Sequence, residues 1–543
     1  MKIILLFVLM ASMLVPTPAS AQKNEGFPKR PKLVVGLVID QMRYDFLYRY
    51  SERYGEDGFK RLMDRGHSCE NMFINYLPSF TAPGHTCIYT GSVPSLHGIS
   101  SNDWIDRLTG KELYCTEDAN AKAVGGTQRA GRMSPKNLLV NTITDEMRLA
   151  TNFRSKTIAV SVKDRASILP GGHTSNGSYW MDDSNGVFMT STFYMNELPL
   201  WVINFNSRNP TKKYMDQNWN TLYPIASYTQ STADNNVYEG KFTAETQPVF
   251  PHQTAGMKLS DVKKTPYGNN LVFDFAREAI VHEKLGQDEY TDFLCISCSS
   301  PDYIGHQFGP NSIEIEDTYL RLDRDIADFL KDLDEQVGEG NYTIFLTADH
   351  GVAHNPRFLQ DQKIPAGFFY GSKLKDELNT YLKPLFKSDR LIRSVGENFV
   401  WLNHAAADSL KIDEKNIKLE ILKTLKLHDE IQFVVDMEDL DHALLPNPLR
   451  EMAINGYNAK RSGDILLLLN PGWFDAYAVT GTTHGTWNPY DAHIPMLWYG
   501  WGIKKGVTER RVFMTDITAT LSSLLHIQMP NGCVGECIGE VIR

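Results

Sequence analysis

Four apolar, β-branched runs constrain the fold of this chain more than any other feature. They lie at residues 33–39, 157–162, 292–297 and 342–347, and turn or polar residues bound each run. Short, continuous runs of this kind are typical of strands covered on both faces, as in a parallel sheet with crossover helices. Between them, residues 313–333 carry apolar side chains at helical spacing. The pattern predicts an α/β fold with a doubly wound, mostly parallel sheet flanked by helices.

The first residues predict a leader rather than a part of this fold. Lys2 precedes an apolar run over residues 3–15, and the small-residue site Ala19-Ser20-Ala21 follows. This is the layout of a secretory signal peptide, although a buried N-terminal helix is the alternative. Cleavage near Ala21 and Gln22 would give an exported protein, either periplasmic or extracellular. No Cys follows the cleavage site and no later stretch approaches twenty apolar residues, so we expect no membrane anchor.

Two segments interrupt the strand and helix pattern. Residues 191–265 are rich in Asn, Thr, Tyr and Trp and have few long apolar runs, which indicates a cap or lid insertion. Residues 371–470 contain a Lys-rich amphipathic stretch near 413–427 and several strand-like runs, which indicates a small α+β insertion. After a signal peptide at 1–21, the catalytic core would then consist of residues 22–190, 266–370 and 471–543.

Charge and cysteine content exclude some classes of protein. With 55 basic and 65 acidic residues the formal net charge is −10, which argues against a stable nucleic-acid partner. The seven cysteines are an odd number, so at least one thiol has no partner within the chain. Cys295 and Cys298 lie in a predicted strand and are expected to be buried structural residues. Cys533 and Cys537 could form a disulfide bond in an oxidising compartment.

Potential metal ligands follow nearly every predicted core strand. In open α/β sheets, ligands bind beyond the carboxyl ends of the strands, so these residues are expected to meet there. Any one of them alone is more often a helix cap or a satisfied polar group. Mixed imidazole and carboxylate ligation suits Zn²⁺ better than Ca²⁺ or Mg²⁺, and six ligands suit two ions. The predicted ligands are Asp40, Asp302, His306, Asp349, His350 and His484.

A nucleophile and a set of phosphate-binding residues are also available. Thr81 lies two residues before Pro83, a favourable first-turn residue, so Thr81 is expected at a helix N-terminus, where backbone N–H groups favour an anion. The alternative is an ordinary helix cap. Asn102 lies in the loop that follows this helix. Lys163 and Arg165 follow the strand at 157–162 and could bind a phosphate, although a solvated surface pair is equally consistent with the spacing.

Together these segments resemble the alkaline phosphatase superfamily, which includes nucleotide pyrophosphatase/phosphodiesterases, sulfatases and cofactor-independent phosphoglycerate mutases. The resemblance covers most of the mature chain and is strongest in five blocks, at residues 38–43, 80–99, 301–306, 347–351 and 481–485. It implies two zinc ions. Asp302, His306 and His484 would hold one ion, and Asp40, Asp349 and His350 would hold the other beside the Thr81 oxygen.

The resemblance also distinguishes among the activities of this superfamily. Sulfatases need a Cys or Ser where this chain has Thr81, and phosphoglycerate mutases use Ser and are not normally secreted. Lys163-Asp-Arg165 matches the bacterial phosphate-irrepressible alkaline phosphatases of the PafA type, in which Lys and Arg contact the phosphoryl oxygens. A monoester dianion has an extra charged oxygen that two cations would favour, whereas a diester has a second organic group.

The sequence therefore predicts a secreted, zinc-dependent alkaline phosphatase with broad specificity for phosphate monoesters. Thr81 would form a covalent phosphothreonine, and Asn102, Lys163 and Arg165 would bind the non-bridging oxygens. We expect small-molecule substrates and a monomer. Two alternatives remain at this point. One is a phosphodiesterase or nucleotide pyrophosphatase of the same superfamily, and the other is a non-enzymatic zinc- or phosphate-binding protein.

Overall fold

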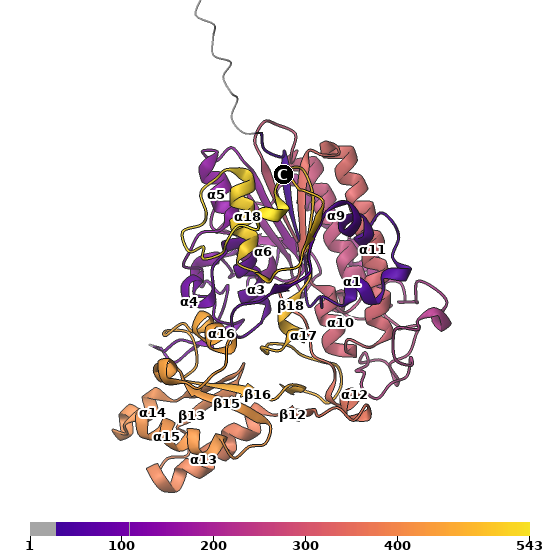
Figure 1. Ribbon diagram of the computed structural model, residues 1–543. Helices are drawn as coiled ribbons and strands as arrows, with labels where there is room; N and C mark the ends of the chain where they lie inside the picture. The colour runs from indigo at the N-terminus through magenta and orange to yellow at the C-terminus, as the bar shows by residue number, and fades with distance from the viewer. Residues whose placement is uncertain (1–28, 108) are drawn as a thin grey trace, which may run out of the picture.

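A ten-stranded sheet forms the centre of the molecule in a computed structural model that describes residues 29–107 and 109–543 (Figure 1). The leader predicted at 1–21 lies outside the described residues. The five central strands are parallel, and the outer strands are mixed. In spatial order the strands are β20 (Gly506–Thr508), β2 (His67–Cys69), β19 (Met496–Gly500), β11 (Tyr342–Thr347), β1 (Leu33–Ile39), β10 (Asp292–Cys298), β7 (Thr157–Ser161), β8 (Gly177–Met181), β9 (Phe188–Ser191) and β6 (Ala123–Val124).

Helices cover both faces of this sheet, as the doubly wound prediction requires. Figure 1 shows α5, α6 and α18 on one side and α9 and α11 on the other. The amphipathic helix predicted at 313–333 is α11, and it begins after Ser312, whose hydroxyl accepts a hydrogen bond from the Ile315 amide. The flanking helices are α3 (Thr81–Thr90), α5 (Ile143–Ala150), α6 (Arg165–Gly171), α9 (Tyr267–Glu283), α10 (Ser300–Phe308), α11 (Ile313–Leu333) and α18 (Asp516–Leu525).

The strand register brings the ends of the central strands to one edge. Leu33 of β1 pairs with Asp292 of β10 and with Tyr342 of β11, so the three strands start and end together. All residues of β1, β10 and β11 are buried, which explains their continuous apolar sequences. The segments that follow these strands therefore emerge side by side at the carboxyl edge of the sheet.

The apolar run at residues 493–498, which follows His484, forms parts of two strands instead of one continuous strand. Pro495 divides it into β18 (His493–Ile494), which pairs with β3 (Met72–Phe73), and β19, which pairs antiparallel with β11. Proline has no N–H to donate to a ladder, so one continuous strand cannot form across it. Other short elements are α1 (Phe46–Arg49), α2 (Phe59–Arg65), α4 (Pro94–His97), β4 (Asp103–Ile105), β5 (Glu112–Tyr114), α12 (Pro356–Asp361), β12 (Gly367–Phe369), β17 (Trp473–Asp475), α17 (Pro489–Ala492) and β21 (Val512–Phe513).

The segment 191–265 contains two short α-helices, α7 (Leu200–Ser207) and α8 (Pro210–Met215), two 3-10 helices, η3 (Ile225–Ser227) and η4 (Leu259–Lys264), and no strand beyond Ser191, where β9 ends. It packs against α11 through buried polar contacts. Trp219 Nε1 and the Leu222 amide both donate to the Asp317 carboxylate, at 2.8 and 2.6 Å. His252 lies between the carboxylates of Glu245 and Glu314, with N···O distances of 3.1 and 3.0 Å.

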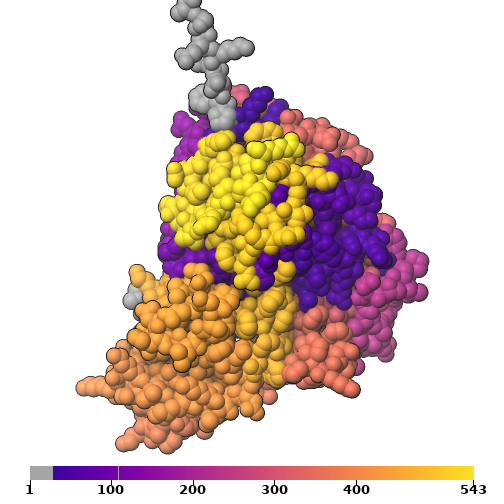
Figure 2. Space-filling view, viewed as in Figure 1, coloured from indigo at the N-terminus to yellow at the C-terminus, as the bar shows by residue number. Residues whose placement is uncertain are grey.

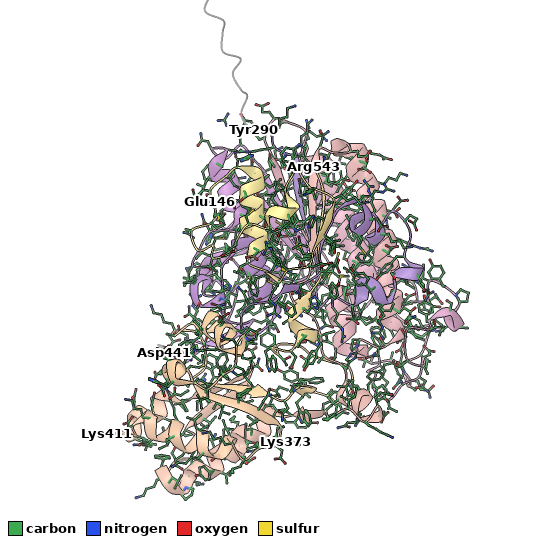
Figure 3. All side chains as sticks on the ribbon, viewed as in Figure 1. Glu146, Tyr290, Lys373, Lys411, Asp441 and Arg543 are labelled. Carbon is green, nitrogen blue, oxygen red and sulfur yellow. The ribbon has the colours of Figure 1, made fainter. Side chains whose placement is uncertain are left out.

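The segment 371–470 forms a lobe with its own hydrophobic core (Figure 2). Its sheet has the order β13 (Ile392–Gly396), β14 (Phe399–Leu402), β16 (Ile465–Leu469), β15 (Ile431–Asp436). Figure 1 places the lobe beside the end of the core where α10 and α17 lie, and Figure 3 labels Lys373, Lys411 and Asp441 on it. Its helices are α13 (Gly371–Phe386), α14 (His404–Leu410), α15 (Glu414–Leu425) and α16 (Leu449–Gly456).

All seven cysteines are free thiols. Cys295 and Cys298 are buried in β10, in agreement with their predicted structural role, and the pair Cys533 and Cys537 is not bonded. Among residues 29–107 and 109–543, no helix is both long and apolar enough to cross a lipid bilayer.

Candidate active site

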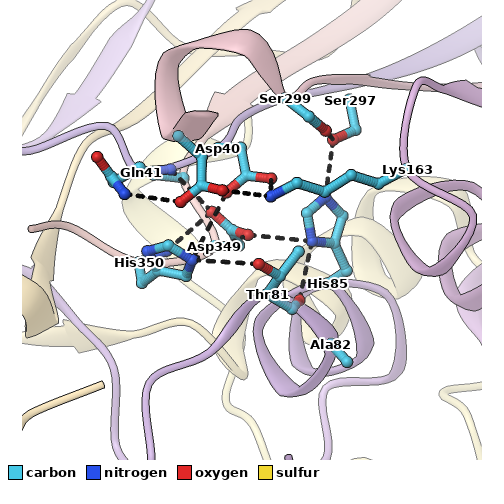
Figure 4. A network of polar contacts seen from close by, with 12 residues as sticks. Asp40, Gln41, Thr81, Ala82, His85, Lys163, Ser297, Ser299, Asp349 and His350 are labelled. Carbon is cyan, nitrogen blue, oxygen red and sulfur yellow. Dashed lines mark hydrogen bonds and ion pairs between the residues drawn. The ribbon is translucent and has the colours of Figure 1, made fainter. Parts of the chain in front are cut away.

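Thr81 is the first residue of α3 and lies at the carboxyl edge of the sheet. Phe80 precedes it in an extended conformation, and the Thr81 side chain is 1% exposed. Its Oγ1 is 3.4 Å from His350 Nε2 (Figure 4). The amide of Ala82, one of the free N–H groups at the helix start, donates to Asn102 Oδ1 at 3.0 Å. Because its oxygen is used in this way, Asn102 keeps its Nδ2 donor for another partner.

The six predicted ligands meet around this hydroxyl. Asp40 follows β1, Asp349 and His350 follow β11, and α10 carries Asp302 and His306 four residues apart on one face. One ligand atom from each of Asp302, His306 and His484 lies within 4.8 Å of the others, and the same holds for Asp40, Asp302 and His350. The first group is the predicted one. In the second, Asp302 takes the place expected for Asp349, whose Oδ2 is 3.5 Å from His350 Nε2.

The three imidazoles are oriented by backbone carbonyl groups. Nδ1 of His306 bonds to the Thr482 oxygen at 2.9 Å, Nδ1 of His350 to the Gly351 oxygen at 3.0 Å, and Nδ1 of His484 to the Ser79 oxygen at 2.9 Å. A carbonyl only accepts, so each Nδ1 carries a proton and each Nε2 faces the centre, where it can bind a metal ion once it is deprotonated. This is the arrangement found in metal-binding histidines.

The loop that carries His484 approaches α10 through a glycine. Gly481 has a φ of +70°, and a Cβ at this position would lie 1.9 Å from the His306 carbonyl oxygen. Only glycine permits this contact and this backbone conformation together. It allows Thr482 to lie where its oxygen accepts the hydrogen bond from His306.

The buried carboxylates of the site repel one another. Burial, reinforced by the charge of Asp349, raises the pKa of Asp40 to about 8. Burial also opposes ionisation of Asp302, but His306 and Lys163 hold the pKa of Asp302 well below its usual range. Burial and the neighbouring His350 lower the pKa of His484. Asp40 Oδ1 and Asp349 Oδ2 are buried and accept no hydrogen bond; His350 Nε2 lies 3.5 Å from each, and His85 Nδ1 lies 3.3 Å from Asp349 Oδ2. Cations at this centre would satisfy both atoms and relieve the repulsion, so these residues fit metal ions.

Lys163 lies between the two groups of ligands. Its Nζ donates to Asp40 Oδ2 and to Asp302 Oδ2, both at 2.6 Å, and the side chain is buried. Burial would lower the pKa of Lys163, but Asp302 and Asp40 raise it, so the ammonium is charged. The alternative of a solvated surface residue is therefore wrong for Lys163.

Arg165 is the first residue of α6 and donates to the Tyr114 hydroxyl at 3.2 Å. Its Nε is buried without a partner. Arg165 and Lys163 line one cavity of about 450 Å³, together with Tyr303 and Lys263. The two predicted phosphate-binding cations thus face the same space beside the ligand cluster.

Two polar residues of the site were not predicted. Gln41, with a φ of +67°, donates its amide to Asp349 Oδ1 at 3.1 Å and its side-chain Nε2 to Asp302 Oδ1 at 2.6 Å. His85 bonds to the Thr81 carbonyl oxygen at 3.0 Å and to Ser297 Oγ at 2.9 Å, as Figure 4 shows. His85 lies one helical turn after Thr81, and this spacing was the signal available in the sequence.

Several known proteins are similar to this chain over most of its length. A model of the family "Type I phosphodiesterase / nucleotide pyrophosphatase" matches residues 34–491. A Myroides odoratus protein named calcium-transporting ATPase is 51% identical over 522 residues, 95% of both chains. Alkaline phosphatase PhoV of Synechococcus elongatus is 49% identical and is covered over 100% of both chains. The crystal structure of wild-type alkaline phosphatase PafA matches with a TM-score of 0.93 at 47% identity, over 95% of this chain and 100% of that one.

Proposed function

The chain belongs to the type I phosphodiesterase / nucleotide pyrophosphatase family and is an alkaline phosphatase, and we propose that it hydrolyses phosphate monoesters through a covalent intermediate on Thr81. The observation that best supports the monoester assignment is the position of Lys163. Its buried ammonium lies 2.6 Å from one carboxylate of each ligand group and shares a cavity with Arg165. Two cations beside the nucleophile favour a dianionic phosphoryl group over a diester monoanion.

In the proposed reaction, the Thr81 hydroxyl gives up its proton to solvent and its oxygen attacks phosphorus as the bond to the leaving oxygen breaks, and that oxygen takes up a proton from water to leave as the alcohol. Water then attacks the phosphothreonine, releases phosphate and restores the hydroxyl. Asn102 Nδ2, Lys163 and Arg165 bind the non-bridging oxygens and hold phosphorus in line with Thr81 Oγ1. His85, bonded to the Thr81 carbonyl, fixes the start of α3.

A metal cofactor is part of this proposal, and we infer two zinc ions. Asp302, His306 and His484 would hold one, and Asp40, Asp349 and His350 would hold the other, with Asp302 close enough to both groups to interact with either ion. When bound, the ions would lower the pKa of the hydroxyl and of water and stabilise the leaving oxygen. Metal analysis of purified protein should give two zinc ions per chain.

We further propose that the enzyme is a monomer with broad monoester specificity, exported after cleavage near Ala21 and Gln22. N-terminal sequencing of the protein from the periplasm or medium tests the cleavage site.

Replacement of the nucleophile tests the proposed chemistry. Thr81→Ala should lower kcat for an aryl phosphate at least about 1,000-fold, because no oxygen remains to form the intermediate. Zinc content should stay near that of the wild type. Thr90→Ala, at the other end of α3, is the matched control, since its hydroxyl donates to the Thr86 carbonyl and accepts from the Ser92 amide and contacts no residue of the candidate site.

Acid-quenched wild-type enzyme should carry labelled phosphate, and Thr81→Ala should carry none. Full turnover by Thr81→Ala would exclude the mechanism. A preference for a methyl aryl diester over the monoester would instead indicate a phosphodiesterase.

A further inference from the structure

The lobe formed by residues 371–470 reaches the catalytic core at the tip of its β13–β14 hairpin. This tip consists of Glu397 and Asn398, which lie between Gly396 of β13 and Phe399 of β14. The Ser101 hydroxyl, next to Asn102, donates to Glu397 Oε2 at 2.6 Å. Asn398 Nδ2 donates to the Gly485 carbonyl oxygen, next to His484, at 2.5 Å. Two adjacent residues of the lobe thus contact two separate loops of the candidate site.

Both residues of the tip have a positive φ, as the favoured turns of two-residue hairpins require. Glu397 has a φ of +53° and Asn398 a φ of +64°. Asparagine tolerates this left-handed region, but a glutamate in it is unusual, and glycine would be the unstrained choice. Glycine would not provide a carboxylate for Ser101. A glutamate at a position that favours glycine points to a demand for its carboxyl group there.

The tip is also held firmly enough to act as a rigid support. The Leu467 amide of β16 donates to the Asn398 carbonyl oxygen at 2.7 Å, which ties the turn to the sheet of the lobe. Elsewhere on the lobe, Arg461 donates to the carbonyl oxygens of Gly98 and Asn137 in the core, both at 2.6 Å. These two hydrogen bonds fix the lobe to the core. Glu397 and Asp103 line a cavity of about 570 Å³ between lobe and core.

We propose that Glu397 and Asn398 are positioning residues for the phosphatase reaction. Glu397 fixes the loop of Asn102 through Ser101, and Asn398 fixes the loop of His484 through Gly485. The lobe then helps to hold the active-site loops in their reactive geometry, although Glu397 and Asn398 themselves contact neither substrate nor metal. This inference rests on the proposed roles of Asn102 and His484.

A double-mutant cycle tests the contact to the Asn102 loop. Glu397→Ala should lower kcat/KM for an aryl phosphate at least about tenfold, and Ser101→Ala should have a similar effect. In an Asn102→Ala background, Glu397→Ala should cost less than about twofold, because the group it positions is absent. Asp389→Ala is the control, since it breaks only an exposed ion pair with Lys383 on the same lobe.

Glu397→Gly separates positioning from stability. Glycine adopts the positive φ without strain, so this variant should be at least as thermally stable as Glu397→Ala and just as impaired in catalysis. For the second contact, Asn398→Ala should raise the zinc dissociation constant of one site about tenfold, measured against a chelator.

The outcomes distinguish this inference from the proposed function. Suppose that Asn102→Ala reduces activity and that Glu397→Ala lowers kcat/KM by the same factor in the Asn102→Ala background as in the wild type. Glu397 then does not act through Asn102, and the inference is wrong. Recovery of activity in Glu397→Gly would mean that Glu397 is merely structural. Unchanged zinc affinity in Asn398→Ala would remove the second contact from the proposal. If Asn102→Ala itself keeps full activity, the role of Asn102 in the proposed function falls, and the inference about Glu397 falls with it.

Discussion

Gly84 offers the most direct test of how the nucleophile is placed relative to the metal ligands. It lies one turn into α3, where the helix packs against the backbone of the segment that follows β11. A Cβ at Gly84 would lie 2.5 Å from the Asp349 carbonyl oxygen and 2.7 Å from Asp349 Cβ. Neither atom belongs to a flexible side-chain end, so Gly84→Ala requires the helix and Asp349 to move apart.

The size of this displacement follows from the same distances. The Cβ is about 0.9 Å short of the 3.4 Å at which ordinary van der Waals contact begins. Thr81 is on the same helix three residues earlier, so its hydroxyl would shift by a similar amount relative to Asp349 and His350. A misplacement of about 1 Å in an active site can cost about 100-fold in rate. We therefore expect kcat/KM to fall about 100-fold, with an overpacking cost of about 1–3 kcal/mol in stability.

The assay is steady-state hydrolysis of an aryl phosphate by Gly84→Ala at saturating zinc, together with thermal unfolding. Gly539→Ala is the control, because a Cβ there meets no atom within 4 Å. A loss of activity that persists at saturating zinc would show displacement of Thr81 rather than loss of metal. If Gly84→Ala is folded and retains wild-type kcat/KM, the close packing of α3 on Asp349 does not determine the position of Thr81, and the reasoning fails.

Three further predictions concern charge, pH and metal. Replacing Lys163 and Arg165 together by Ala should lower kcat/KM for a monoester by about 10²- to 10⁴-fold, since each charged hydrogen bond contributes about 1.5–3 kcal/mol. The same change should lower kcat/KM for a methyl diester far less. Equal losses on both substrates would mean that the two residues have a structural or uniform binding role. Burial would lower the pKa of His252, but Glu245 and Glu314 raise it to about 9. Protonated His252 therefore adds about 3 kcal/mol to the free energy of unfolding. This contribution is present below pH 6.5 and is lost as pH rises through 9. Thermal unfolding from pH 6 to 10 should show this decline, and the profile of His252→Asn should be flatter over that range. A chelator should abolish activity, zinc should restore it, and full activity in zinc-free protein would contradict the metal proposal.

The sequence predicted the central strands well because their burial removes ambiguity. Every residue of β1, β10 and β11 is covered on both faces, so each strand appears as an uninterrupted apolar run with few alternative readings. The sequence is less informative at the edge, where Pro495 divides an apolar run into two strands and the outer ladders are partly antiparallel and partly parallel. Edge strands have mixed surroundings, and their sequences constrain pairing less.

The candidate site was predictable to the extent that its residues follow strands. Asp40, Asp349 and His350 directly follow a buried strand, and parallel register brings such positions together whatever the intervening chain does. Which carboxylate lies nearest to which imidazole depends on side-chain rotamers. For this reason the sequence did not indicate that Asp302 would lie within reach of both ligand groups.

The residues that the sequence did not reveal act through other residues. Gln41 and His85 contact ligands or backbone rather than the reacting centre, and a Gln or His at such a position has no chemical signature of its own. The same holds for Glu397, which is about 300 residues from Ser101 in sequence. Contacts between distant loops depend on how the lobe packs on the core. Local patterns can therefore identify the groups that perform a reaction, whereas the groups that position them become visible only when the chain is folded.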